Sequence, residues 1–244
     1  MKVTLFVRFA LVALVALVAL VGGACTGDLP EPFDLDHTRI VAVQANPPGI
    51  LSGETSTLVS LLATEGATTH EAPPEEAIVV SPLSLASALA PDGSSVTAPD
   101  EAALAAARTE LGLMPTEPVP LRVAVSYNGR ALVATKIVIL GEARSNPSID
   151  SATINGMRLA DLSAITIDAA AETRLAVDAT TLDAPSWLSS VGTVHDYDQP
   201  TAYITVDTKD LIDGEFALVY RDAKTGVTWR VWPIHADGTP RKPQ

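Results

Sequence analysis

The hydrophobic pattern divides this chain into two unlike parts. An unbroken apolar run extends from Phe9 to Val21, whereas beyond residue 38 short stretches of alternating apolar and polar residues are separated by turn residues. Alternation with a period of two places successive side chains on opposite faces of a β-strand. The pattern therefore predicts a distinct N-terminal segment followed by a mainly β protein.

The first half of the chain predicts several strands. Arg39–Gln44 has apolar residues in both phases, which indicates a strand partly buried on both faces, and the Asn128-Gly129 pair is a strong hairpin signal. Polar, proline-containing residues 65–77 predict a loop. Strands are expected at Arg39–Gln44, Thr55–Ala63, Ile78–Val80, Leu121–Tyr127 and Ala131–Leu140.

One helix is predicted, over residues 98–111. Thr97 is the expected N-cap, Pro99 suits the first turn, and Gly112 is a good C-terminal stop. The apolar face is narrow, chiefly Leu104 and Leu111. We therefore expect an insertion packed on the edge of a sandwich.

The second half predicts another set of strands, separated by turns at the spacing of a β-sandwich. These strands lie near Ser151–Leu159, Ala164–Ile167, Thr173–Val177, Ala202–Val206, Glu215–Arg221 and Val227–Pro233, and the turn of the last hairpin is shaped by Asp222 and Gly226. Trp187, Trp229 and Trp232 are expected to dominate this core.

The predicted organisation is therefore two small β-sandwich domains with one inserted helix, behind an N-terminal signal. Few contacts are expected to cross a hinge at Ser145–Ser148. The predicted parts are a signal peptide at 1–24, a tether at 25–37, domain one at 38–144, domain two at 145–236 and a disordered tail at 237–244.

The first 24 residues have the features of a secretory signal. Lys2 and Arg8 precede the apolar run, and Gly22-Gly23-Ala24 supplies small residues before a cut. The run is shorter than the ~20 residues that a membrane span needs. A buried core helix or a true membrane anchor is the alternative. Everything after residue 24 is expected to be exported.

The segment Leu20-Val21-Gly22-Gly23-Ala24-Cys25 resembles a bacterial lipobox, although Gly22 stands where an aliphatic residue is usual. The resemblance implies that Cys25 is lipidated and becomes the first residue. A lone cysteine has no disulfide partner in an oxidising compartment. Ordinary signal-peptidase cleavage that leaves a free thiol is the alternative. Thr26, where lipoproteins retained at the inner membrane often carry aspartate, implies the outer membrane.

Charge excludes some partners. Of 244 residues, removal of residues 1–24 leaves 220 and takes away Lys2 and Arg8, so that 14 basic residues face 29 acidic ones, a net charge of −15. Such a chain repels nucleic acid and anionic lipid headgroups. No nucleic-acid partner is therefore expected.

Two further segments carry a family resemblance. RIVAVQANPPGILSGETSTLVSLLAT, from Arg39 to Thr64, resembles the start of immunoglobulin-like or PKD-like domains of bacterial surface lipoproteins. The Ala217–Trp229 hairpin resembles the final hairpin of such domains, with Thr225 in place of a glycine, and Ser189–Thr193 resembles one of their strand ends. The resemblance implies a cell-surface lipoprotein with immunoglobulin-like β-sandwiches and supplies no catalytic site.

Candidate chemistry is sparse. The histidines, His37, His70, His195 and His235, lack the spacing of metal ligands. Ser189, Ser190, His195 and Asp196 include the residue types of a catalytic triad, but we interpret them as turn residues because no nucleophile-elbow motif is present. Asp196, Asp198, Asp207, Asp210 and Asp213 form an acidic stretch that binds calcium or is simply solvated.

The sequence thus predicts a lipid-anchored protein of the bacterial cell envelope with a binding or structural display role. Its expected partner is the lipid bilayer, through acylated Cys25. No catalytic residue, cofactor or metal ligand is assigned. The alternatives are an exported hydrolase with a site at the domain interface, and a subunit of an envelope complex with an envelope protein as partner.

Overall fold

A computed structural model describes residues 31–177 and 185–240 of the chain. The described residues are mainly β, as predicted, and the chain from Pro32 on forms one compact unit. The predicted signal peptide, Cys25 and the first part of the tether lie outside the described residues. No helix within the described ranges is both long and apolar enough to span a membrane.

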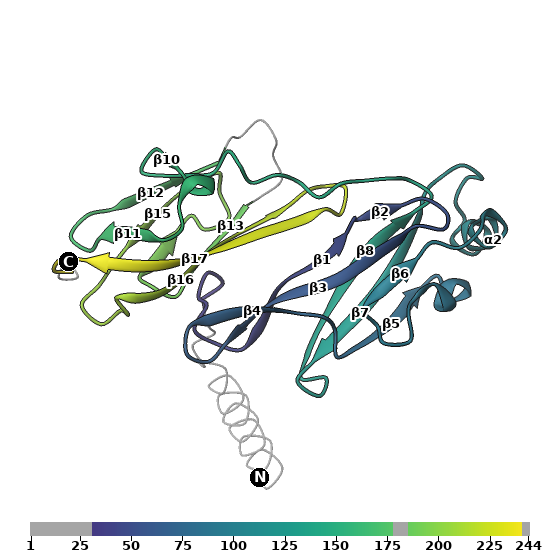
Figure 1. Cartoon of the computed structure of the whole chain (residues 1–244), viewed down its shortest axis with the longest axis horizontal. Coiled ribbons are helices and arrows are strands. Elements are labelled where there is room, and N and C mark those ends of the chain that lie inside the picture. Colours follow the sequence, from purple (N-terminus) through teal and green to yellow (C-terminus); the bar gives the residue numbers. More distant parts are fainter. Residues whose placement is uncertain (1–30, 178–184, 241–244) are drawn as a thin grey trace, which may run out of the picture. The chain divides into compact units, whose positions relative to one another are not determined.

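The first half forms two sheets that enclose one core (Figure 1). Side chains of both sheets, among them Leu58 and Val123, meet in this core. One sheet contains β1 (Arg39–Asn46), β3 (Thr55–Thr64), β4 (Thr68–Ala72) and β6 (Ser95–Thr97), and the other contains β2 (Gly49–Ile50), β8 (Leu132–Leu140), β7 (Val119–Tyr127) and β5 (Glu76–Ser81).

The second half also forms two sheets around a core of its own, in which Trp187, Phe216 and Trp232 are buried. One sheet has the order β10 (Met157–Arg158), β9 (Thr153–Ile154), β12 (Thr173–Ala176), β15 (Thr201–Thr205) and β14 (Thr193–His195). The other has the order β11 (Ile165–Asp168), β17 (Val227–Asp237), β16 (Asp213–Arg221) and β13 (Pro185–Ser189). Two paired sheets in each half agree with the predicted β-sandwiches, whereas the immunoglobulin-like resemblance stays a prediction.

The β7–β8 hairpin follows from its sequence. The odd-numbered residues of β7 are buried and most even-numbered ones face outward, as strand alternation requires. Asn128 and Gly129 have positive φ angles of 52° and 58°, which these residue types tolerate best. Arg130 is also left-handed, so the connection is longer than a two-residue turn. The predicted hairpin is confirmed.

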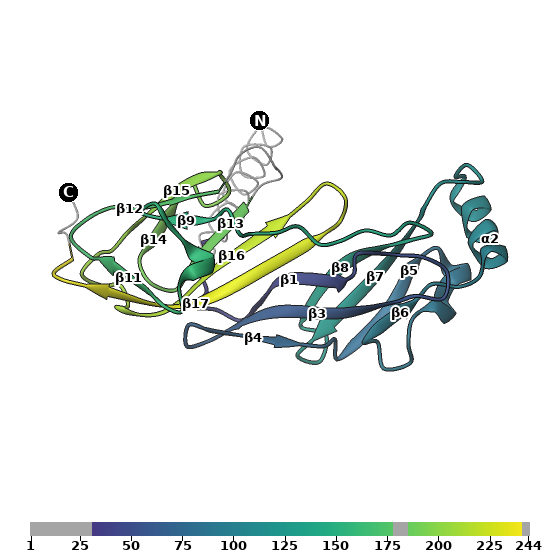
Figure 2. The same cartoon turned by 45° about the horizontal axis from the view of Figure 1, so that its top comes forward.

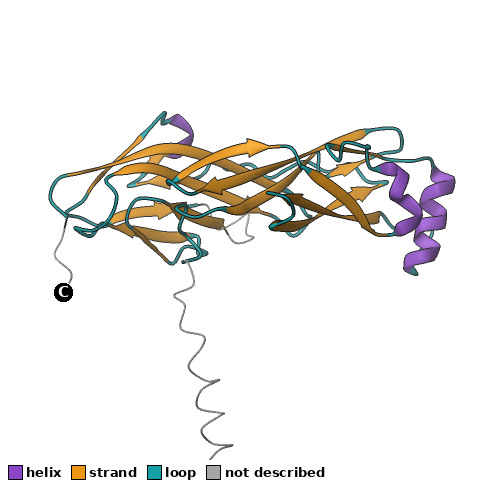
Figure 3. Ribbon diagram, turned by 90° about the horizontal axis from the view of Figure 1, so that it is seen from below, coloured by secondary structure: helices purple, strands orange, loops and turns teal. Residues whose placement is uncertain are grey.

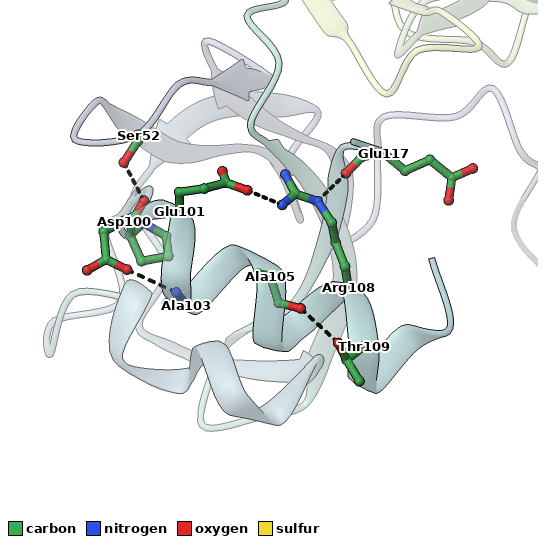
Figure 4. Close-up of polar contacts among 9 residues, drawn as sticks. Ser52, Asp100, Glu101, Ala103, Ala105, Arg108, Thr109 and Glu117 are labelled. Carbon is green, nitrogen blue, oxygen red and sulfur yellow. Dashed lines mark hydrogen bonds and ion pairs between the residues drawn. The ribbon is translucent and has the colours of Figure 1, made fainter. Parts of the chain in front are cut away.

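The predicted helix is α2 (Glu101–Leu111), and its start differs from the prediction. The Ala103 amide donates to Asp100 Oδ1 at 2.9 Å, so Asp100 is the N-cap (Figure 4). Thr97 instead belongs to β6, where it pairs with Thr55. Gly112 adopts the left-handed C-cap conformation, as predicted.

The buried side of α2 consists of Leu104, Ala107 and Arg108. The Arg108 guanidinium donates to Glu101 at 2.5 Å and to the Glu117 carbonyl at 2.7 Å, so its buried charge is paired (Figure 4). The helix contacts η1 (Leu83–Ala88) and β7, and the two helices lie together at one end of the strands (Figure 3).

Three local predictions are wrong. Residues 65–77 include β4, because the left-handed Gly66 and Ala67 form a tight turn that returns the chain along β3. Residues 151–159 form two short strands, β9 and β10, around a left-handed Asn155-Gly156 turn. Strands β13 and β14 were not predicted, and they place Ser189 and His195 in strands rather than turns.

A third apolar cluster joins the two halves. Residues of β1 and β3, including Ala42, Leu61 and Ala63, pack with Leu188, Ala217, Val219 and Val227 of β13, β16 and β17. The prediction that few contacts cross residues 145–148 is therefore wrong, because both sandwiches bury part of an outer face. The predicted domain boundaries themselves stay a prediction.

Trp229 belongs to this third cluster and not to the core of the second half. Along β17 the side chains of Val227, Trp229 and Val231 share one face, whereas Trp232 and Ile234 face the second core. The prediction that all three tryptophans share one core is correct for Trp187 and Trp232 and wrong for Trp229.

The last residues of the predicted tether pack against the fold. Phe33 and Leu35 are buried. The backbone of this segment exchanges two hydrogen bonds with Ser189: Leu35 N donates to Ser189 O, and Ser189 N donates to Phe33 O. Residues 33–35 therefore add a short extension beside β13.

Candidate functional site

The residues with the chemistry of a catalytic triad do not meet. The buried Ser189 hydroxyl donates to the Val191 carbonyl at 2.8 Å, and Ser190 exchanges hydrogen bonds with the Glu215 backbone. His195 Nε2 is hydrogen-bonded to Thr205 Oγ1 at 2.9 Å. Among the described residues no hydrogen bond joins either serine to His195, so this group lacks a nucleophile–base pair.

The acidic stretch is divided between two turns and the start of β16, where Asp213 lies. Asp210 accepts from the Asp207 amide at 2.7 Å. The Asp213 carboxylate accepts a hydrogen bond from His235 Nδ1 at 2.7 Å, and this bond raises the pKa of that histidine. In residues 31–177 and 185–240, no three histidine, cysteine or acidic side chains are grouped so as to hold a metal ion. Whether Asp196, Asp198 and Asp207 are merely solvated stays a prediction.

A different place gathers charged side chains: a cleft of about 590 Å³ where the two halves meet. Strand β1 lies beside β8 (Figure 2), and the cleft opens between these strands and the β16–β17 turn. We call it the basic cleft. Its lining comprises Ile40, Val41, Ala42, Val43, Arg122, Ala134, Thr135, Lys136, Ile137, Arg221, Asp222, Thr225, Gly226 and Val227.

Lys136 lies on the inner side of the basic cleft. Its position along β8 is in phase with the core residues Val138 and Leu140, and the residue is only 5% exposed. Its ammonium group donates to the Thr225 carbonyl at 2.5 Å. No other acceptor for it exists among the described residues, although an ammonium group carries three N–H donors.

Burial alters the protonation of Lys136. It lowers the pKa of the ammonium group to about 8, with the nearby Asp222 carboxylate opposing this and the Arg221 charge adding to it. A buried cation is costly unless it is paired. The cleft therefore contains a cation that its own residues stabilise only in part.

Two arginines complete the cationic lining. Arg221 donates to the Ser186 hydroxyl at 3.0 Å and to the Val41 carbonyl at 2.9 Å, and burial lowers its pKa. Arg122 is exposed and makes no hydrogen bond or ion pair with any residue that the structure describes. Its five N–H donors face solvent at the cleft.

The β16–β17 turn forms the wall of the cleft opposite β1 and β8. Asp222 Oδ1 accepts from the amides of Lys224 and Gly226 at 2.8 and 2.7 Å. The prediction that Asp222 and Gly226 shape this turn is therefore confirmed. Thr225 is left-handed, with a φ angle of 73°, and its buried hydroxyl has no hydrogen-bond partner among the described residues. Asp222, the one carboxylate of the lining, is thus already engaged.

The lining is predominantly cationic. It contains three cations and one engaged carboxylate, but no histidine, cysteine or serine. This excess of positive charge lies on a chain whose net charge is −13. Such a site attracts an anionic group.

Comparison with known proteins identifies no family. No family model and no curated protein matches the chain. A similar solved structure is the Bacteroides ovatus mixed-linkage glucan utilization locus protein SGBP-B in complex with a mixed-linkage heptasaccharide, with 11% identity and a TM-score of 0.20. The match covers 78% of this chain and 43% of that one. Because this likeness is weak, the proposals below depend on the residues of this chain.

Proposed function

We propose that this protein is exported and anchored by lipid to the outer membrane of the bacterial envelope. Its proposed role is to bind a ligand in the basic cleft. The signal-like residues 1–24 and the position of Cys25 support export and anchoring. The observation that carries the binding role is the open cleft of about 590 Å³ with partly unpaired cations.

The hydrolase alternative receives less support from the same cleft. Its perturbed groups are cations, and the described residues place no serine next to a histidine there. A binding site needs only donors that converge on the ligand, which the cleft provides.

A role as subunit of an envelope complex is a second candidate, supported by another surface. Ile78 and Val133 are 63% and 62% exposed on the outer face of β5, β7 and β8, and they line a hollow of about 210 Å³. Exposed apolar patches of this kind mark protein interaction sites when they are continuous.

A bulky substitution tests whether the basic cleft is the binding site. Thr135 is exposed and lines the cleft, so Thr135→Trp is expected to abolish the binding of a ligand found on arrays of envelope glycans and peptides. Val133→Trp is the matched control, because Val133 lies two residues away on the same face of β8 but outside this cleft.

The two variants separate the outcomes. Retained binding by V133W together with lost binding by T135W supports the cleft. Equal binding by the two variants, loss of binding in V133W alone, or a wild-type protein that binds nothing on the arrays contradicts the proposed function.

A further inference from the structure

We infer that the basic cleft holds an oxyanion of its ligand, a carboxylate or a phosphate group, on the cations of its lining, with the Arg122 guanidinium at the rim and the Lys136 ammonium inside. This inference rests on the proposed function, since it specifies the ligand of the same cleft. It assigns to the cleft a ligand that carries an isolated negative charge on an otherwise neutral body.

Arg122 is the outer anion-binding group. The guanidinium has no protein partner among the described residues and projects from β7 opposite Ile137, another lining residue. Its planar fork matches the geometry of carboxylate and phosphate oxygens. An arginine free to form two parallel hydrogen bonds is well suited to the first capture of an oxyanion.

Lys136 is the inner group. One of its three N–H donors is used by the Thr225 carbonyl, and the buried Thr225 hydroxyl is itself unpartnered. An oxyanion at this place would accept from the remaining ammonium donors and would compensate a buried charge that Asp222 compensates only in part. Two independent features of the cleft, an unsatisfied hydroxyl and an under-paired ammonium, thus point to the same missing acceptor.

The net charge of the chain and the apolar wall of the cleft restrict the kind of ligand that can carry the oxyanion. The chain has a net charge of −13, so a polyanion extending beyond the cleft meets repulsion within the screening length of ~8 Å at physiological salt. The cleft wall from β1 is apolar, with Ile40, Val41 and Val43. A neutral or partly apolar ligand body with one oxyanion satisfies both conditions.

The test uses the full-length protein and defined probes. Sodium glucuronate represents a carboxylate on a neutral body, glucose is its uncharged counterpart, and sodium phosphate represents the other oxyanion. Binding is measured by calorimetry at constant ionic strength. Arg122→Gln is expected to weaken the binding of the better anion at least about tenfold, as expected for lost charge-assisted hydrogen bonds.

Arg174→Gln is the matched control for R122Q. Arg174 is also exposed and its side chain has no hydrogen bond to a described residue, but it lies on β12, outside the cleft. We expect R174Q to bind within about twofold of the wild-type protein and glucose not to bind. The preferred probe, glucuronate or phosphate, identifies which oxyanion the cleft takes.

Each other result overturns the inference. Absence of anion binding to the wild-type protein, equal weakening in R122Q and R174Q, or unchanged affinity in R122Q would do so. If an array ligand is lost in T135W but kept in R122Q, the proposed binding function stands and the oxyanion inference fails. If T135W keeps that ligand, the proposed function itself fails.

Discussion

Replacement of Trp187 by alanine is expected to lower the free energy of unfolding by about 3–5 kcal/mol, the usual cost of removing a large buried side chain. Trp187 is fully buried, its ring lies 6.1 Å from that of Phe216, and its indole N–H donates to the Gln199 carbonyl at 2.9 Å. The substitution leaves a cavity in the core of the second half and removes the hydrogen bond to the Gln199 carbonyl. Chemical denaturation followed by circular dichroism measures the loss.

Trp229→Ala is the control for this prediction. Trp229 is half-buried in the third cluster and its indole N–H donates to an exposed partner, Glu71. We expect a loss of about 1 kcal/mol, in the range usual for a partly exposed site. If both substitutions cost the same, the assignment of Trp187 and Trp229 to different environments is wrong.

The stability of the protein is expected to rise between pH 8 and pH 10 because of Lys136. Its pKa is about 8 in the folded protein and near the ordinary 10.5 in the unfolded chain. Within this window the unfolded state binds more protons, so the free energy of unfolding increases with pH. At 1.36 kcal/mol per pKa unit, the gain is about 2 kcal/mol. Above pH 10 the raised pKa of buried Tyr127 acts in the opposite direction.

Lys136→Met tests this prediction because it keeps the length of the side chain without its charge. Thermal unfolding at several pH values is expected to show the rise in the wild-type protein and not in K136M. The other charged residues that line the cleft, Asp222, Arg221 and Arg122, are unchanged in this variant. Identical pH profiles for the two proteins would contradict the account of a buried, under-paired ammonium.

Local signals in the sequence predict much of the fold. Asn128-Gly129 defines the β7–β8 hairpin, and apolar residues in both phases of β1 indicate the burial of both its faces. Strand β4 is different, because Thr68–Ala72 has no apolar alternation and becomes a strand only through pairing with β3. Its polarity suits a strand at the edge of a sheet.

One strand at the junction between the two halves carries a sequence signal for burial on both faces. Phe216–Tyr220 is an unbroken apolar run with every residue buried, which indicates a strand covered on both faces. That pattern was compatible with a junction to another sheet. Which sheet covers the second face depends on contacts between distant residues, and one sequence does not determine them.

The basic cleft was also only partly visible in the sequence. Lys136 occupies an inward position between Ala134 and Val138, where an apolar residue is expected, and a buried lysine at such a position marks a functional candidate. Its hydrogen-bond acceptor, Thr225, is 89 residues away in the chain. Convergence of β1, β8 and the β16–β17 turn is a property of the tertiary fold and has no local pattern.

Export and anchoring at the envelope underlie the whole functional account, and the intact mass of the protein purified from membranes tests them most directly. We predict a chain that begins at Cys25 and carries the added mass of acyl chains, each methylene of which contributes ~0.8 kcal/mol to membrane binding when buried. In the control Cys25→Ser, we expect an uncut precursor or a soluble exported form with the same fold, because the described fold begins after this residue. A membrane-bound chain that still begins at Met1, or an unmodified Cys25 at the N-terminus, would contradict the account.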